Sequence, residues 1–350
     1  MRFELTEDQT LLRTTMREFL AAEYPLEATR RVLEHDPRGY DPAAWRRFAE
    51  MGYVGLTVPA SAGGQGLGAI ELAVVCEEMG RVCAAGPFLD VTLAAHLLAA
   101  AGGQEALLAE VCEGKRLVTI ARLDAPFAGT AAPPARWHAG RVRGRKYFVP
   151  FAAQADALLV ATAEGVCLVP GHFDATALPT IDLACRFGEV QLDREATLLG
   201  PLGLLDDVDR LAAVAASATL LGLMGRALEM TLAYVQTREA FHRPIGGFQA
   251  LQHRLAEMLL RAESTRSAVY RAAWCLATGD AETALACAAA KAYAGDAARL
   301  VCGEAIQMHG GIGFTWELDL HFYFKRAKAL EQHYGSTAVQ LERALQAAGF

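Results

Sequence analysis

The pattern of apolar and polar positions predicts helices at the start of the chain. Thr6-Glu7-Asp8-Gln9 is a capping box, in which the Thr6 hydroxyl accepts from a free helix N–H and Gln9 reaches back. Apolar residues follow at helical spacing, and the same spacing returns in three further segments, 42–51, 72–82 and 91–101. Gly-rich breaks separate these segments. We therefore expect an all-helical domain over residues 1–114.

After Gly114 the pattern changes to short runs of β-branched and aromatic residues. The runs are 117–120, 146–149, 157–162 and 166–169, the last two joined by a Glu164-Gly165 turn. Such runs are typical of strands bounded by turn residues. They predict a small β domain over residues 115–203.

From about Leu204 the strand signals stop, and roughly four long tracts rich in Ala and Leu follow. They are 207–238, 247–278, 281–309 and 316–346. At about 1.5 Å per residue each spans roughly 45 Å, and their small residues let helix axes approach closely. We expect a helical bundle over residues 204–350. Its most apolar uncharged stretch, 211–225, falls short of the ~20 residues that cross a bilayer, which predicts a buried helix.

Composition and charge narrow the class of protein. The chain has 350 residues, of which 53% are hydrophobic and 21% charged, enough for two or three globular domains. A net charge of −7 without any cluster of Lys or Arg argues against nucleic acid as a partner. Charged residues among the first eight positions argue against a secretory signal, so we expect a cytoplasmic protein. The eight cysteines form no C-x-x-C pair and have no His at zinc spacing, which predicts reduced thiols and no metal site.

Three Gly-containing segments are candidates for function. The first, 63–68, resembles a phosphate loop, but it lacks the Gly-Lys-Ser/Thr ending and a preceding strand, so a loop between helices is the better interpretation. The second, 307–316, joins two long helices, and by itself it suits a helix C-cap. The third, 238–249, places an Arg, a Phe and a Gln within one loop. The Arg can bind a diphosphate, the Phe can stack on a planar ring, and the Gln can hydrogen-bond to polar ring atoms. Together the second and third segments suit a flavin dinucleotide.

In combination these segments resemble the acyl-CoA dehydrogenase family along nearly the whole chain. The matching segments are Leu5-Thr6-Glu7-Asp8-Gln9; Gly55-Leu56-Thr57-Val58-Pro59 with the glycines of 63–68; Gly144-Arg145-Lys146 with Ala155-Asp156; Arg238-Glu239-Ala240-Phe241 through Gln249; and Gln307 through Phe314. Each one could arise by chance. Their shared order and spacing make coincidence improbable.

The resemblance implies an α+β fold with an N-terminal helical domain, a middle β-barrel domain and a C-terminal four-helix bundle. It implies a tetramer or a dimer of dimers, with FAD between the middle and C-terminal domains. It also implies that an adjacent subunit supplies contacts to the dinucleotide, from Arg238, Phe241, Gln249, Gln307, Gly310 and Gly311. The family reaction removes a proton next to the thioester carbonyl of an acyl-CoA and passes a hydride to the flavin, which an electron-transfer acceptor then reoxidises.

The glutamate that takes this proton in most family members is absent. Its usual place, in a Tyr-Glu-Gly-Thr-like stretch near the C-terminus, corresponds to Tyr334, and its alternative place early in the first C-terminal helix corresponds to Ala212. A phenol with a pKa near ~10 is a poor base at neutral pH. We therefore expect Tyr334 to line or fill the site.

The middle domain departs from the family pattern as well. Residues 122–129 stand where the family has a Thr-Glu-Pro-x-Ala-Gly-Ser-like segment. Pro150 stands where the family has a Thr that bonds the flavin, and proline offers neither an N–H nor a hydroxyl. His242 replaces the Gly that usually follows the Phe. Such departures are typical of one subunit of paired acyl-CoA dehydrogenases that assemble as α2β2 tetramers.

Three hypotheses remain open at this point. In the first, the chain is an FAD-dependent subunit of a heteromeric enzyme that dehydrogenates a bulky acyl-CoA such as a steroid side chain, and a homologous partner supplies the base. In the second, it is a non-catalytic, flavin-free structural partner. In the third, it forms a homo-oligomer that uses another carboxylate, such as Glu239 or Glu331.

Overall fold

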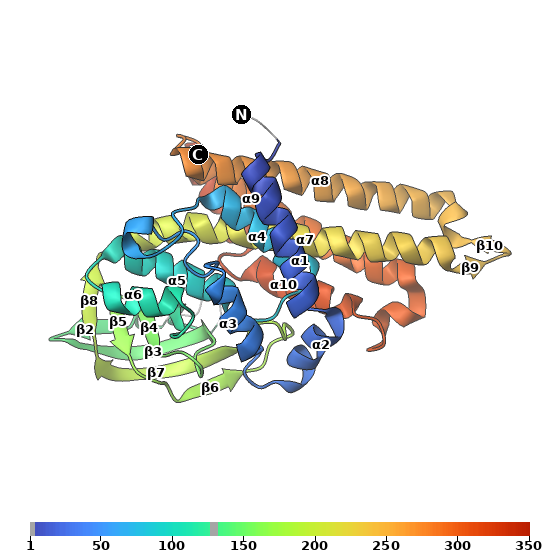
Figure 1. Ribbon diagram of the computed structural model, residues 1–350. Helices are drawn as coiled ribbons and strands as arrows, with labels where there is room; N and C mark the ends of the chain where they lie inside the picture. Colours follow the sequence, from blue (N-terminus) through green and yellow to red (C-terminus); the bar gives the residue numbers. More distant parts are fainter. Residues whose placement is uncertain (1–3, 127–131) are drawn as a thin grey trace. The chain divides into compact units, whose positions relative to one another are not determined.

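The computed structural model describes residues 4–126 and 132–350 (Figure 1). Packing divides the chain into two compact units. Unit 1 consists of Met1–Arg30, Ala69–Ala84 and Ala212–Phe350, and unit 2 consists of Arg31–Gly68 and Ala85–Leu211. The order of elements along the chain is helices, then strands, then helices, as the sequence predicts. The boundaries 1–114, 115–203 and 204–350 stay a prediction.

The first third of the described chain is helical. Its helices are α1 (Glu7–Glu23), α2 (Leu26–His35), α3 (Pro42–Glu50), α4 (Ala69–Arg81), α5 (Phe88–Ala101) and α6 (Glu105–Cys112), with a short 3-10 turn η1 (Ala60–Ala62). The capping box forms as expected, because Gln9 N donates to the Thr6 hydroxyl at 3.2 Å and Thr6 N donates to Gln9 Oε1 at 3.0 Å. Two short helices, α2 and α6, were not predicted.

The strands of unit 2 form two four-stranded sheets. They are β1 (Val118–Ala121), β2 (Arg136–His138), β3 (Arg141–Pro150), β4 (Ala157–Thr162), β5 (Gly165–Pro170), β6 (Ala175–Leu178), β7 (Phe187–Glu195) and β8 (Thr197–Gly200). One sheet has the order β1-β4-β5-β8 and the other β2-β3-β7-β6. Only the β1–β4 pair among these is parallel. Residues from both sheets, among them Val149, Val160 and Leu192, share one buried core.

The last part of the chain consists of long helices. They are α7 (Leu204–Thr237), α8 (Gln249–Thr278), α9 (Thr283–His309), α10 (Leu320–Gln332) and α11 (Thr337–Ala347). Between α7 and α8 lie the short strands β9 (Glu239–Ala240) and β10 (Arg243–Pro244) and the 3-10 turn η2 (Ile245–Gly247); η3 (Gly310–Phe314) follows α9. By length and composition α7 could cross a membrane, but 89% of its most apolar window is buried within the chain. The prediction of a buried helix is therefore confirmed.

The prediction of one continuous helical tract over residues 316–346 was wrong. It is two helices, α10 and α11, with a turn between them. Tyr334 and Gly335 adopt positive φ angles of 60° and 96°, which end the first helix. The Ser336 side chain then accepts from Val339 N and starts the second.

Two glycines let the backbones of α4 and α7 touch within unit 1. A Cβ at Gly222 would lie 2.0 Å from the carbonyl oxygen of Glu77, and one at Gly80 would lie 2.2 Å from that of Thr219. No real Cβ contact is so short, so both positions require glycine. This close approach is what small residues in helical tracts allow.

Gly222→Ala should therefore destabilise the protein, because the new methyl group meets rigid backbone. We expect a loss of about 1–3 kcal/mol, the usual cost of overpacking. The matched control is Gly225→Ala on the same helix, where the nearest atom to a Cβ is Arg81 Nη1 at 3.5 Å. There the better helix propensity of Ala should leave stability unchanged or slightly raised. Thermal unfolding followed by circular dichroism measures both, and equal midpoints for the two variants would contradict the tight crossing.

Candidate functional site

The segment after α7 forms a small hairpin at the tip of the α7–α8 pair (Figure 1). Strands β9 and β10 pair there, and the turn residues Phe241 and His242 have φ angles of 55° and 64°. A two-residue hairpin turn of this kind needs positive φ at both positions. Gly adopts this conformation most readily, and histidine is among the other residues that tolerate it better than most. Phe241 is 86% exposed at the tip.

The second segment begins where α9 ends. Gly310 has a φ of 63°, and a Cβ at Gly313 would lie 2.3 Å from the carbonyl oxygen of Ile306, so the chain turns tightly over the helix end. Gln307, Gly310 and Gly311 are exposed. No atom lies within 4 Å of a Cβ built at either of these last two glycines. Their backbone is therefore open to a ligand or to another chain.

The structure brings these two segments together in unit 1. The Tyr234 hydroxyl, one turn before the hairpin, donates to the carbonyl oxygen of His309 at 3.3 Å. The two rings stack with centroids 4.3 Å apart. Because the segments leave from joined helix ends, the predicted cofactor residues lie at one end of the bundle. All six are exposed: Arg238, Phe241, Gln249, Gln307, Gly310 and Gly311.

The exposed groups suit the diphosphate and ring system of a dinucleotide. Within the described residues, the side chain of Arg238 has no hydrogen-bond or ion-pair partner, so its guanidinium is available to an anion. Phe241 offers an open aromatic face, and the glycines after α9 offer unobstructed backbone. These residues fit FAD.

The middle domain fits the flavin less well. Pro150 is buried at the end of β3 and pairs with Phe187 of β7. Just before it, Phe148 has a φ of 48° and the register with β7 shifts. This strand therefore presents no hydroxyl or N–H at Pro150. Of the predicted segment 122–129, residues 127–129 lie outside the described residues.

An ion pair between a buried lysine and a partly exposed aspartate holds the first part of that segment. Lys146 is fully buried, and its Nζ lies 2.6 Å from Asp124 Oδ1 and donates to the carbonyl oxygen of Arg122 at 3.0 Å. Burial lowers the pKa of Lys146, and Asp124 opposes this shift. Asp124 also accepts from Ala135 N at 2.9 Å. The Lys of the Gly-Arg-Lys motif is thus a structural cation.

Neither place of the family base holds a carboxylate. Ala212 is buried in α7. Tyr334 lies in the turn between α10 and α11, where Gln340 Nε2 donates to its carbonyl oxygen at 2.8 Å. From α9, Lys291 Nζ donates to the carbonyl oxygens of Glu331 and Gly335 at 3.0 and 3.1 Å. Buried side chains therefore fix this turn although the glutamate is missing.

The two alternative carboxylates do not have the environment of a desolvated base. Glu331 is buried, but its Oε2 is 2.8 Å from Lys328 Nζ. Glu239 is exposed at the start of β9. Its charge is solvated.

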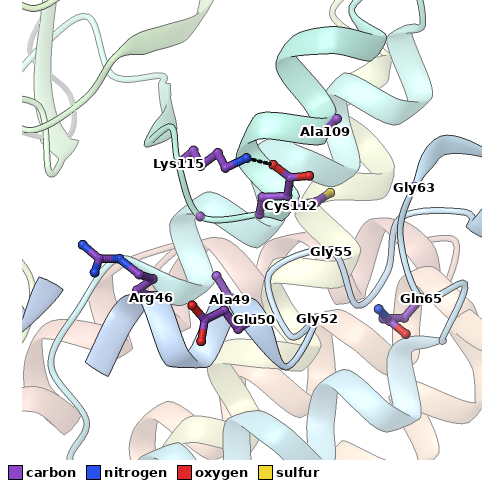
Figure 2. Close-up of a pocket in the computed structure, with 12 residues that line it drawn as sticks. Arg46, Ala49, Glu50, Gly52, Gly55, Gly63, Gln65, Ala109, Cys112 and Lys115 are labelled. Atoms are coloured by element: carbon purple, nitrogen blue, oxygen red, sulfur yellow. Dashed lines mark ion pairs between the residues drawn. The ribbon is translucent and has the colours of Figure 1, made fainter. Parts of the chain in front are cut away.

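The glycine segment 63–68 borders a hollow of about 750 Å³ at the ends of α3 and α6 (Figure 2). Arg46, Glu50 and Lys115 surround this hollow, and Lys115 pairs with Glu113 at 2.5 Å. The N–H groups of the segment donate to nearby backbone carbonyls: Gly64 N donates to Pro59 O, and Gln65 N donates to Gly55 O. They do not converge on a phosphate, which agrees with a loop between helices.

Cysteine and metal chemistry add no site in the part of the chain that the structure describes. All eight cysteines are buried and free, as predicted. Within residues 4–126 and 132–350, no group of three His, Cys, Asp or Glu is placed to hold a metal ion.

Comparison with known proteins places this arrangement in a family. Sequence models of the acyl-CoA dehydrogenase N-terminal and C-terminal domains match residues 6–114 and 209–349. Acyl-CoA dehydrogenase IpdE2 of Mycolicibacterium smegmatis is 34% identical over 97% of this chain and 98% of its own length. The chain belongs to the acyl-CoA dehydrogenase family.

Solved structures agree with this assignment. A chain of the ChsE4-ChsE5 complex from Mycobacterium tuberculosis superposes with a TM-score of 0.89 at 29% identity, covering 100% of this chain and 99% of that one. A chain of the Tcur3481-Tcur3483 steroid ACAD G363A variant gives 0.87 at 29% identity over 98% of each. PigA, solved with FAD and proline, shares the fold with a TM-score of 0.88 at 23% identity, covering 100% of this chain and 99% of that one. The predicted family and fold are confirmed, and FAD is the cofactor of this acyl-CoA dehydrogenase family.

In this acyl-CoA dehydrogenase family chain, sequence reasoning missed the residues that hold the site segments. Tyr234, Lys291 and Gln340 belong to none of the sequence motifs described above. Lys291 had a signal, since it is a single charge within the tract Ala288-Ala289-Ala290-Lys291-Ala292. A lone charge in an apolar helix is costly to bury unless it has partners.

Lys291 should make the free energy of unfolding vary with pH in the alkaline range. Burial lowers its pKa from 10.5 to about 8, with the Glu331 carboxylate opposing. The folded state therefore releases the proton first, and stability should rise between pH 8 and 10.5, by up to about 3 kcal/mol. Urea unfolding of Lys291→Met should lack this rise. The control Lys328→Met should keep it, and a parallel pH dependence of the wild type and Lys291→Met would contradict the assignment.

Proposed function

We propose that this chain is an FAD-dependent subunit of a heteromeric acyl-CoA dehydrogenase that introduces a double bond between the α and β carbons of a bulky acyl-CoA. A homologous partner subunit supplies the base. One observation carries the proposal: the residues predicted to bind a dinucleotide are exposed at one end of unit 1, whereas the two positions that the resemblance assigns to the base hold Tyr334 and Ala212. A chain that binds the cofactor but has no base needs a partner that supplies one.

The residues of this chain would bind and orient the cofactor. The Arg238 guanidinium would form a bidentate contact with the diphosphate, and the Phe241 ring would stack on a planar ring. Gln249 and Gln307 would donate and accept at polar ring or ribityl atoms, and the Gly310 and Gly311 backbone would approach closely. FAD, when bound, supplies the hydride acceptor. The exposure of all six residues supports contacts to a dinucleotide held mainly by an adjacent subunit.

The relatives support the assembly and the class of substrate. ChsE4-ChsE5 is named as a complex, and Tcur3481-Tcur3483 as a steroid acyl-CoA dehydrogenase. By analogy we assign an α2β2 tetramer in the cytoplasm, a steroid-like acyl group, and an electron-transfer acceptor that reoxidises the flavin. We also assign the three-domain division 1–114, 115–203 and 204–350 to each subunit of this type.

A second candidate is a flavin-free structural subunit, which Pro150 and Tyr334 favour. The two functions differ in a simple observable, the visible flavin spectrum of the chain purified alone and with its co-expressed partner. A homo-oligomer that uses Glu239 or Glu331 has less support, because one carboxylate is exposed and the other is paired with Lys328.

Arg238→Ala should weaken FAD retention in the assembled enzyme, because the diphosphate loses its cationic partner. We expect a loss on the order of 2–5 kcal/mol in binding free energy. Flavin absorbance per protein after gel filtration measures it. The control is Arg271→Ala, an exposed arginine of α8 that pairs with Glu282. Equal flavin content in both variants would refute the dinucleotide assignment.

The chain without its partner should show little dehydrogenation of any acyl-CoA, since general-base catalysis contributes ~10²–10⁴-fold. Tyr334→Glu restores a carboxylate in the turn that Lys291 and Gln340 fix, and should give measurable activity when flavin is bound. Tyr334→Gln is the uncharged control. Turnover by the wild-type chain alone at ordinary enzymatic rates would show that the base lies elsewhere, with Glu239 and Glu331 the first to mutate.

A further inference from the structure

Tyr234 is connected to both segments that carry the candidate cofactor residues. Its backbone carbonyl accepts from Arg238 N at 2.8 Å, as the last turn of α7 passes into the hairpin. Its hydroxyl donates to the carbonyl oxygen of His309, the last residue of α9, at 3.3 Å. One side chain thus joins the segment of Arg238 to the segment of Gln307 and Gly310.

His309 is built to receive this contact. It is buried, and its Nδ1 lies 2.7 Å from the carbonyl oxygen of Ala305, so Nδ1 carries the proton. Burial lowers the pKa of the imidazole, which keeps the ring neutral against the Tyr234 ring. The rings are nearly parallel, at 24° and 4.3 Å between centroids. Ring and hydroxyl together therefore fix the end of α9 to the end of α7.

The His309 carbonyl lies where α9 passes into the second segment. It is one of the last four carbonyl groups of α9, and His309 is also the N-cap of η3, whose carbonyl accepts the first bond of that turn. The following residue, Gly310, has a positive φ. The Tyr234 hydroxyl therefore donates to the carbonyl group from which the second segment leaves.

The cofactor side chains themselves do not provide such a connection. In the described part of the chain, neither the Arg238 nor the Gln307 side chain has a hydrogen-bond partner. The hairpin closes on itself, through Ile245 N donating to Arg238 O at 2.8 Å. The Tyr234–His309 contact is therefore a direct link between the ends of α7 and α9, beside the Arg254–Glu304 ion pair that joins α8 to α9.

We propose that Tyr234 is a positioning residue for the dinucleotide: its hydroxyl and ring hold Arg238 at a fixed distance from Gln307 and Gly310, so that both segments reach one ligand. This inference rests on the proposed function. Two anchor points bind a rigid diphosphate and ring system together only when their spacing is set before binding, and small displacements of such groups are costly.

The test is the flavin dissociation constant of the chain assembled with its partner, measured by titrating FAD into the apo assembly. Tyr234→Phe keeps the stacked ring and removes only the hydroxyl, and should weaken FAD binding about 3–10-fold, the range for one hydrogen bond. Tyr234→Leu also removes the stack and should weaken it further. The matched control is Ser217→Ala, which deletes a buried hydroxyl that donates to Ala213 O in the same helix; its FAD affinity should equal that of the wild type.

A second readout separates positioning from general stability. The thermal midpoint of the apo assembly should be the same in Tyr234→Phe and in Ser217→Ala, while only the former loses affinity. Unchanged FAD affinity in Tyr234→Phe, or an equal loss in Ser217→Ala, would overturn the inference. If Arg238→Ala lowers flavin retention and Tyr234→Phe does not, this inference alone fails. If Arg238→Ala retains all of its flavin, the proposed function fails first.

Discussion

The last carbonyl groups of a helix have no partner within that helix, and in unit 1 side chains from other helices satisfy them. Tyr323, buried in α10, donates to the carbonyl oxygen of Arg81 at the end of α4. Lys291 does the same for Glu331 near the end of α10, and Tyr234 for the end of α9. These polar contacts at the helix ends therefore fix where the connecting segments begin, and those segments carry the candidate site.

Contacts of the same kind fix the turn between α10 and α11. In the turn between α10 and α11, Tyr334 adopts the left-handed conformation. This conformation costs free energy for a residue other than glycine, and it persists only where the surrounding structure imposes it. Lys291 and Gln340 impose it through the backbone carbonyls. Because neither contact involves the side chain at position 334, the side chain there can change without loss of the turn.

In the β sheets, the backbone next to Pro150 is irregular. Phe148 and Phe151 flank Pro150 and both have positive φ, and Phe151 N donates to Arg186 O at 2.6 Å. A proline here removes one donor, and the register shift before it alters the direction of the strand.

The sequence by itself determined the order of helices and strands, the capping box at Thr6, the buried character of 211–225 and the membership of the family, because each is a local or a motif signal. Hydrophobic spacing also located α7, α8 and α9 within a few residues. It did not show the break at Tyr334 within the tract 316–346, or the short edge strands β2 and β6. Nor could it pair Tyr234 with His309, 75 positions apart, since that contact exists only once the helices have packed. Local periodicity fixes elements, whereas only tertiary packing decides which helix end meets which side chain.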